Sequence, residues 1–261
     1  MDDLRRNDVE QGRVGDSGAA TRAVPPFQSN LAGAGSATPR PPAPRGVAFR
    51  GLTARLVDDH LREVLPSVRR ALEVGPGPRP LLPLLHLDAH TIGVDIVRFD
   101  EAVPAFDEYY VGRAEALPLE SETVDLVVTK WVFEHIEDGN KVMAEFARVL
   151  HGGGTVAFIT PNRDYPAFFV SFLLQRAVPF SLAKKLISRI ARRPQADVYR
   201  SFYRLSTPEA VERAWAPYGK SVIDVVDGET PVYGLRLERF TRGRFARYKP
   251  FMVGRLVRAN E

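Results

Sequence analysis

The chain has no cysteine among its 261 residues and only five histidines. Without cysteine there can be no disulfide cross-link, no zinc site with thiolate ligands and no cysteine nucleophile. The histidines show no spacing that suits a metal ion, and we therefore expect no metal site. The apolar runs, such as 167–170 and 172–174, are far shorter than the ~20 residues that a membrane-spanning helix needs. The N-terminus also lacks the apolar stretch of a secretory signal, so we expect a cytoplasmic protein.

The net charge of +4 conceals an uneven distribution along the chain. Residues 47–159 carry 11 basic and 18 acidic side chains, whereas residues 160–261 carry 19 basic and 9 acidic ones. An acidic region suits a cationic ligand, and a basic region suits an anionic substrate, a membrane surface or nucleic acid. Both regions are also compatible with ordinary solvated faces.

Residues 1–46 contain few large apolar side chains and end in a proline-rich stretch, 38–45. Such a segment buries too little surface to offset the entropy lost on ordering it. We therefore expect a disordered N-terminal arm over 1–46 and one folded domain over 47–261, a length that suits a single core.

Within that domain, short apolar runs alternate with helical patterns. Apolar residues at helical spacing predict a helix over 52–65, and a second, amphipathic helix over 142–150 is expected to end in a left-handed cap at its glycines. Thr207 and Pro208 predict the start of a third helix. The runs expected to be strands are 71–74, 91–94, 109–111, 125–128, 155–159, 221–226 and 252–258. This order predicts an α/β fold with a doubly wound, seven-stranded, mostly parallel sheet of Rossmann-like type.

The alternation stops after Pro161, and residues 163–205 then hold the densest aromatic and basic content of the chain. We expect a helical cap there, inserted after the fifth strand. Its large apolar residues and basic cluster suit either an ordinary lid or a pair of helices at a membrane interface, and both interpretations stay open.

Two features mark the predicted ends of the first two strands. Glu73 begins the run Glu73-Val74-Gly75-Pro76-Gly77, in which glycines permit a close approach of backbone to ligand, and Asp95 follows Gly77 by 18 residues. A carboxylate at that separation can accept hydrogen bonds from both hydroxyls of a ribose, although Asp95 could instead cap a helix. Nicotinamide dinucleotide folds need a third glycine where this chain has Pro80.

Taken with the segments 112–119, 124–136 and 146–154, these features resemble the class I S-adenosylmethionine-dependent methyltransferases, specifically the small-molecule enzymes of methyltransferase type 11. The resemblance implies S-adenosyl-L-methionine as the cofactor. It implies that Glu73 orients the amino group of the cofactor, that Gly75 and Gly77 line its methionine and ribose, and that Asp95 holds the ribose hydroxyls. The other residues that it assigns to the cofactor are Ile96, Ala114, Glu115, Thr129 and Lys130. The sequence departs from the family pattern at Arg79 and Arg113.

Methyl transfer from a sulfonium is an in-line displacement, so the protein mainly holds the reactants in position and excludes water. If the acceptor is a hydroxyl, a general base is useful, and His135 is the candidate because an imidazole titrates near neutral pH. The alternative is a packing histidine within a family signature.

The resemblance therefore predicts methyl transfer to a small-molecule, lipidic or glycosidic acceptor. We expect the accepting group to be a hydroxyl and the acceptor to be anionic or lipidic. A methyltransferase-like binding or scaffold protein without turnover is the alternative, to which Arg79 and Arg113 point. Nucleic acid is the least favoured partner, because the sequence shows no appended RNA-binding domain. Peripheral contact with a membrane is kept open.

Overall fold

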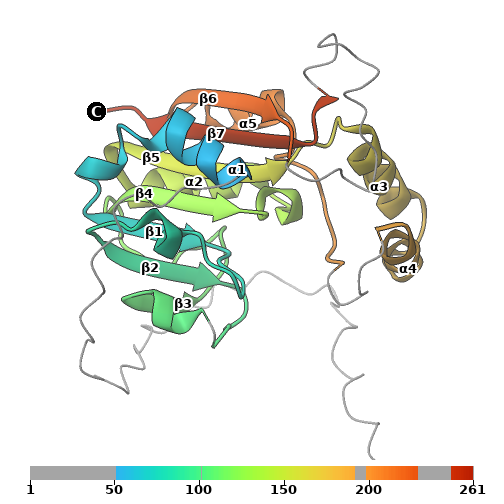
Figure 1. The fold of residues 1–261 in the computed structure, drawn as a ribbon, viewed down its shortest axis with the longest axis horizontal. Helices are drawn as coiled ribbons and strands as arrows, with labels where there is room; N and C mark the ends of the chain where they lie inside the picture. Colours follow the sequence, from blue (N-terminus) through green and yellow to red (C-terminus); the bar gives the residue numbers. More distant parts are fainter. Residues whose placement is uncertain (1–50, 101, 192–197, 229–247, 261) are drawn as a thin grey trace, which may run out of the picture. The chain divides into compact units, whose positions relative to one another are not determined.

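The computed structural model describes residues 51–100, 102–191, 198–228 and 248–260 (Figure 1). The predicted N-terminal arm, residues 1–46, lies outside the described residues.

A single seven-stranded sheet forms the centre of the described chain, as the sequence predicts. Its strands follow the order β3-β2-β1-β4-β5-β7-β6, and β7 is antiparallel to both of its neighbours while the other neighbouring pairs are parallel. The chain passes from β3 to β4 across β1 and β2, so the strand order reverses between β1 and β4. The strands are β1 (Arg70–Val74), β2 (His90–Asp95), β3 (Glu108–Val111), β4 (Val124–Lys130), β5 (Leu150–Pro161), β6 (Gly219–Val226) and β7 (Phe251–Arg258).

Two helices cover one face of the sheet, α2 (Gly139–Val149) and α5 (Pro208–Trp215) (Figure 1). The Asp138 side chain accepts a hydrogen bond from the first turn of α2, and Thr207 does the same for α5, which confirms the predicted helix start. Phe146 of α2 and Trp215 of α5 are fully buried against the sheet. This core fixes the positions of the β4 and β5 ends.

The other face is covered by the start of the described chain. The helix predicted over 52–65 begins as α1 (Gly51–Arg55) and continues as a wider π-type turn, η1 (Leu56–Leu61). Leu56 and Leu61 are fully buried there with sheet residues such as Leu126. A short 3-10 turn, η2 (Leu65–Ser67), leads from η1 into β1.

Helices are scarcer between the first strands than the doubly wound pattern predicts. Between β1 and β2 the described chain forms only the 3-10 turn η3 (Leu82–Leu85), and between β2 and β3 only η4 (Val103–Ala105). Prolines at 76, 78, 80 and 83 account for the first case, because proline lacks the backbone N–H that a continuing helix needs. The glycine turn is therefore followed by an irregular loop.

The predicted glycine cap of α2 is wrong. Leu150 ends the helix in an extended conformation, and β5 begins at this residue and includes the three glycines. They serve a bend in the strand instead: Gly153 has φ +77°, and a Cβ on Gly154 would lie 2.9 Å from the His151 carbonyl oxygen. The pairing with β4 shifts register nearby, between Val124 and Leu126, as expected for a bulge.

The helical insert after β5 consists of α3 (Pro166–Ala177) and α4 (Phe180–Ala191), followed by an extended return over 198–205. Ala183 and Ile187 of α4 pack with Val198 in a small core of their own. Residues 192–197 of the predicted cap lie outside the described residues. Every helix in the described parts of the chain falls short of the length and apolar character that crossing a bilayer requires.

Candidate active site

The predicted cofactor residues lie together at the ends of β1, β2 and β4, next to the point where the strand order reverses. Val74 pairs with Val94 of β2 on one side and with Thr129 of β4 on the other. The residues that follow these three positions therefore emerge at one edge of the sheet. This edge is where ligands of open α/β sheets bind.

The turn after β1 depends on its two glycines. Gly75 has φ +69°, and a Cβ at this position would overlap the Val132 side chain. Gly77 has φ +56°, and nothing lies within 4 Å of the position that its Cβ would take. The first glycine is thus required by packing, whereas the second leaves open space of the kind that a ligand can fill.

Asp95 ties this turn to the end of β2. Its Oδ2 accepts a hydrogen bond of 3.0 Å from the Gly77 N–H, and its Oδ1 accepts a longer one of 3.3 Å from the Val97 N–H. Asp95 begins no helix, so the alternative role as a helix cap is wrong for the described chain. The next residue, Ile96, is 66% exposed, and an uncovered apolar side chain beside a carboxylate suits a nucleoside.

Glu73 is buried beneath the turn. One carboxylate oxygen accepts from the Leu81 N–H at 2.7 Å, and the other accepts from the Leu82 N–H, also at 2.7 Å. Burial raises the pKa of Glu73 to about 7, although these hydrogen bonds and Lys130 oppose the shift. Glu73 therefore holds the irregular loop that follows the turn. Its predicted contact with the cofactor's amino group stays a prediction.

The end of β4 contributes Thr129 and Lys130, which point to opposite faces because side chains alternate along a strand. Lys130 Nζ donates a 3.2 Å hydrogen bond to the carbonyl oxygen of Arg79, where the family pattern has its third glycine. Burial lowers the pKa of Lys130, and nearby Glu73 raises it. The Thr129 hydroxyl is buried, with no hydrogen-bond partner among the described residues.

The predicted adenine segment follows β3. Ala114 is buried, and Arg113 pairs with Glu115 over 3.4 Å between Nε and Oε2. Arg148 of α2 holds the next part of this segment by donating to the carbonyl oxygens of Leu117 and Leu119, at 3.2 and 2.8 Å. Helix α2 thus fixes a loop that the cofactor would touch.

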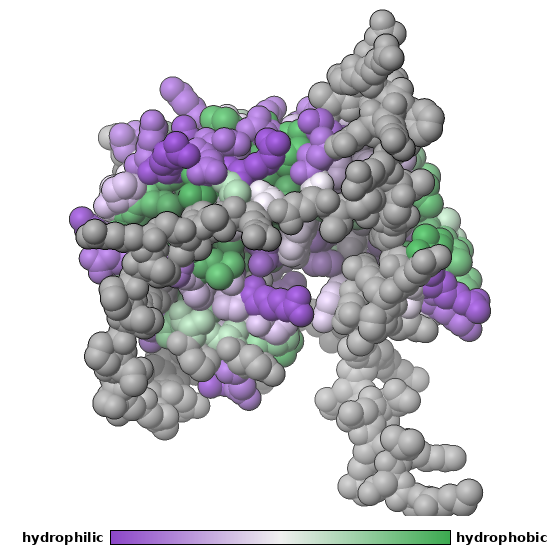
Figure 2. Space-filling view, in the orientation of Figure 1, coloured by the Kyte–Doolittle hydropathy of each residue, from purple (hydrophilic) through white to green (hydrophobic). Residues whose placement is uncertain are grey.

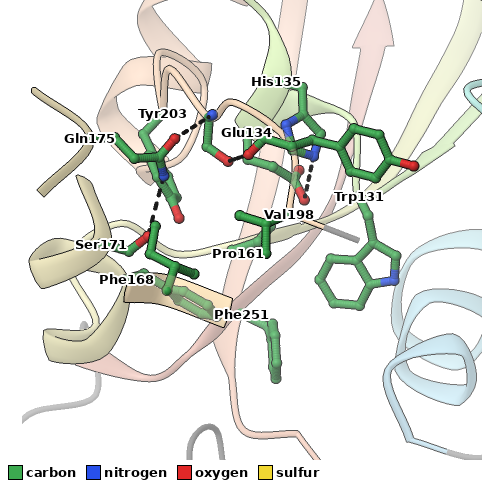
Figure 3. Close-up of a pocket in the computed structure, with 13 residues that line it drawn as sticks. Trp131, Glu134, His135, Pro161, Phe168, Ser171, Gln175, Val198, Tyr203 and Phe251 are labelled. Atoms are coloured by element: carbon green, nitrogen blue, oxygen red, sulfur yellow. Dashed lines mark hydrogen bonds and ion pairs between the residues drawn. The ribbon is translucent and has the colours of Figure 1, made fainter. Parts of the chain in front are cut away.

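A cavity of about 430 Å³ lies between the ends of β4 and β5 and the helical insert, and we call it the cap cavity (Figure 3). The sheet side supplies an acid, an imidazole and aromatic rings, while α3, α4 and the return segment supply apolar and amide or hydroxyl groups. Its lining residues are Trp131, Glu134, His135, Pro161, Phe168, Ser171, Gln175, Ile187, Val198, Tyr199, Ser201, Tyr203 and Phe251.

His135, the predicted base, lines this cavity. Its Nδ1 lies 2.7 Å from the carbonyl oxygen of Arg200. Its Nε2 lies 3.9 Å from Oε1 of Glu134, a contact shown in Figure 3. A carbonyl only accepts, so this contact selects the tautomer with the proton on Nδ1, which leaves the lone pair at Nε2. The imidazole is therefore held in the form that can take a proton from a molecule in the cavity.

Three functional candidates escape the sequence analysis. Glu134 is buried, and its Oε2 accepts from the Thr160 hydroxyl at 3.2 Å. Gln175 bridges α3 to the return segment by accepting from the Ser201 N–H at 2.9 Å. Trp131 has φ +62°, a conformation that costs a bulky residue energy and that concentrates at functional sites. Only Glu134 has a sequence signal, its place beside His135.

Comparison with known proteins agrees with this geometry. Residues 72–158 match the family model described as a methyltransferase domain. A solved S-adenosylmethionine-dependent methyltransferase from Archaeoglobus fulgidus superposes with a TM-score of 0.52 at 14% identity, over 79% of this chain and 92% of that one. A protein from Pyrococcus horikoshii superposes with a TM-score of 0.51 at 17% identity, over 79% of this chain and 89% of that one.

A curated relative, malonyl-[acyl-carrier protein] O-methyltransferase of Methylococcus capsulatus, is 46% identical over 50 residues. The match spans 19% of this chain and 18% of the relative's length. The chain thus has the fold of the S-adenosylmethionine-dependent methyltransferases. The methyltransferase-domain match over residues 72–158 implies S-adenosyl-L-methionine as the cofactor.

The strand-end residues fit this cofactor. The open space at Gly77, the carboxylate of Asp95 and the exposed Ile96 offer room, a partner for hydroxyls and an apolar surface at one edge of the sheet. The individual contacts with the cofactor remain predictions for every residue of the predicted set: Glu73, Gly75, Gly77, Asp95, Ile96, Ala114, Glu115, Thr129 and Lys130.

Proposed function

We propose that the protein transfers a methyl group from S-adenosylmethionine to a hydroxyl of an uncharged acceptor with an apolar body, bound in the cap cavity. The observation that carries the proposal is the hydrogen bond between His135 Nδ1 and the Arg200 carbonyl oxygen. It holds Nε2 as a proton acceptor at a cavity wall. S-adenosylmethionine supplies a methyl group already activated by its positively charged sulfur.

His135 performs the proton transfer in this proposal. The acceptor oxygen forms the new bond to the methyl carbon as the bond from sulfur to that carbon breaks, and the hydroxyl proton passes to Nε2. The ring is then an imidazolium, and the carboxylate of Glu134, 3.9 Å away, stabilises its charge. Glu134 is itself held by Thr160, and it accepts from the backbone N–H groups of Phe202 and Tyr203 through its carbonyl oxygen.

The lining of the cap cavity supports an uncharged acceptor. Among the described residues that line the cavity none is lysine or arginine, so an anionic group would meet Glu134 without a compensating cation from these residues. Trp131 and Phe251 pack edge to face at 5.3 Å between ring centroids, and Phe168 lies 6.1 Å from Phe251. These rings suit an apolar acceptor body, while Ser171 and Gln175 can bind polar substituents.

A second observation supports oxygen as the atom that accepts the methyl group. The curated relative from Methylococcus capsulatus is named as an O-methyltransferase. The matched stretch is short. The proposed preference for an alcohol over a carboxylic acid therefore rests on the lining of the cap cavity and not on this relative.

Label transfer from methyl-tritiated S-adenosylmethionine to a panel of phenols and long-chain alcohols, each beside its matching carboxylic acid, tests the proposal. We expect the alcohols to be labelled. We expect His135→Ala to lower turnover by about 10²–10⁴-fold, with cofactor affinity by calorimetry unchanged. His151→Ala, which changes an exposed histidine on β5, is the control and should keep parental turnover. Preferred labelling of the acids, or parental turnover in His135→Ala, would contradict the proposal.

A further inference from the structure

The outward face of α3 and α4 is apolar where a surface helix is usually polar. Six large apolar side chains are at least 41% exposed there: Phe169, Val170, Leu173, Leu182, Leu186 and Ile190. We call this set the outer cap face. Figure 2 shows apolar surface beside strongly polar surface where Figure 1 places α4. Contiguous apolar surface of this kind marks an interaction site.

The exposed apolar residues of α4 are regularly spaced along the helix. Leu182, Leu186 and Ile190 recur every four residues and so form one stripe along the axis. Ala183 and Ile187, one position further on, are buried in the small core of the insert. The helix therefore has one apolar stripe for its own packing and a neighbouring stripe that faces outward.

Positive charges border the exposed stripe. Lys185 and Arg189 are exposed, and at 100° per residue they fall next to Leu182 and Leu186 on the side away from the buried stripe. The sequences of α3 and α4 contain no aspartate or glutamate, whereas they contain Arg176, Lys184, Lys185 and Arg189. Apolar side chains edged by lysine and arginine are the pattern of a helix lying in a membrane interface.

We propose that the outer cap face docks on an anionic lipid bilayer, with its apolar side chains in the interface and its basic side chains against the headgroups. Charge decides between this occupant and a second copy of the chain. A two-fold contact would bring the basic residues of both copies into one interface, where α3 and α4 offer no aspartate or glutamate to pair with them, which is unfavourable. An anionic surface instead attracts each of them.

Co-sedimentation of the full chain with vesicles tests the proposal. The probes are vesicles of phosphatidylcholine and vesicles in which about a third of the lipid is phosphatidylglycerol. We expect sedimentation only with the anionic vesicles, and we expect it to decline as salt is raised because exposed charges are screened. No sedimentation with anionic vesicles at low salt would overturn the proposal.

Charge reversal separates the outer cap face from the general positive charge of the chain. Lys185→Glu with Arg189→Glu should weaken binding to anionic vesicles at least ~25-fold, from about fivefold for each basic residue lost. The matched control, Arg213→Glu with Lys220→Glu, removes one arginine and one lysine that are exposed on α5 and β6, and should bind nearly as the parent does. Equal loss in both variants would overturn the proposal.

Because the chain has no cysteine, one introduced thiol reports on one position. A dye sensitive to polarity on Leu186→Cys should shift to the blue with anionic vesicles, while the same dye on Lys220→Cys should not. Thermal unfolding confirms that each labelled variant is folded. A dimer in sedimentation velocity that Leu182→Ser and Ile190→Ser dissociate would show that a second copy covers this face. A Leu186→Cys dye that is already blue-shifted without vesicles would show that another part of the protein covers it. Either result would overturn the proposal.

Discussion

Asp95 has one observed contact, with the glycine turn, and one predicted contact, with the cofactor. Its Oδ2 accepts a hydrogen bond from the Gly77 N–H and so holds the glycine turn. The predicted second contact of this carboxylate is with the ribose hydroxyls of the cofactor. We expect Asp95→Ala to weaken binding of S-adenosylmethionine tenfold or more, because charge-assisted hydrogen bonds of ~1.5–3 kcal/mol are lost. Titration calorimetry measures this effect.

Two further variants make the Asp95 result interpretable. Asp95→Asn keeps an acceptor for the Gly77 N–H and should bind the cofactor with intermediate affinity. Asp100→Ala removes a side chain that is 84% exposed and should leave affinity unchanged. A folded Asp95→Ala protein with parental affinity would show that the cofactor lies elsewhere.

Single residues show where sequence reasoning succeeds and where it stops. Gly75, Gly77 and Asp95 were predictable as neighbours, because glycine turns and strand ends follow from local pattern. The hydrogen-bond partners of Glu73 were not, since they lie on an irregular loop whose path depends on tertiary packing. The left-handed backbone of Trp131 has no sequence signal at all, because a bulky residue adopts it only where its surroundings impose it.

At the scale of elements, α2 acts as a brace for the loop after β3. Arg148 donates to Glu145 with two nitrogen atoms, at 2.8 Å each, and also to the Leu117 and Leu119 carbonyl oxygens. Arg148 in turn lowers the pKa of Glu145. The helix and the loop are therefore joined by one planar, forked group.

Arg148→Lys should therefore destabilise the protein. A lysine has one nitrogen and cannot serve Glu145 and both carbonyl oxygens together, so we expect the free energy of unfolding to fall by about 1–2 kcal/mol. Denaturant titration measures the change. Arg213→Lys, at an exposed position on α5, is the control for the same chemical change. Equal stability of Arg148→Lys and the parent would mean that the brace contributes nothing.

Elements also differ in how far their sequence determines them. The seven strands and the starts of α2 and α5 follow from alternation and from capping side chains. The end of α2 does not, because the same three glycines permit either a left-handed cap or a bent strand, and pairing of β5 with β4 and β7 selects the strand. The short turn after β1 is set by the prolines at 76, 78, 80 and 83, because proline lacks the backbone N–H that a continuing helix needs.

For the whole molecule, Glu73 makes stability depend on pH. The folded chain keeps a proton on Glu73 up to a pKa of about 7, whereas the unfolded chain releases it near the ordinary value of 4.5. Between these values the folded state binds more protons, so the free energy of unfolding falls as pH rises, by roughly 3 kcal/mol in total.

This contribution is measured by difference. Denaturant titrations of the cofactor-free parent and of Glu73→Gln, repeated from pH 4.5 to 8, should show the parent losing stability relative to the variant across that window. Glu137→Gln, at an exposed glutamate, should run parallel to the parent. A constant difference between the parent and Glu73→Gln would show that Glu73 is ionised throughout.

The reversal of strand order between β1 and β4 divides the molecule's two tasks along the chain. Gly75, Gly77 and Asp95 precede β4, whereas the described residues that line the cap cavity all follow it. The two recognition surfaces can therefore evolve separately. Exchange of α3, α4 and the return segment between related chains should therefore alter which molecule is accepted and leave the strand edge predicted to bind the cofactor unchanged.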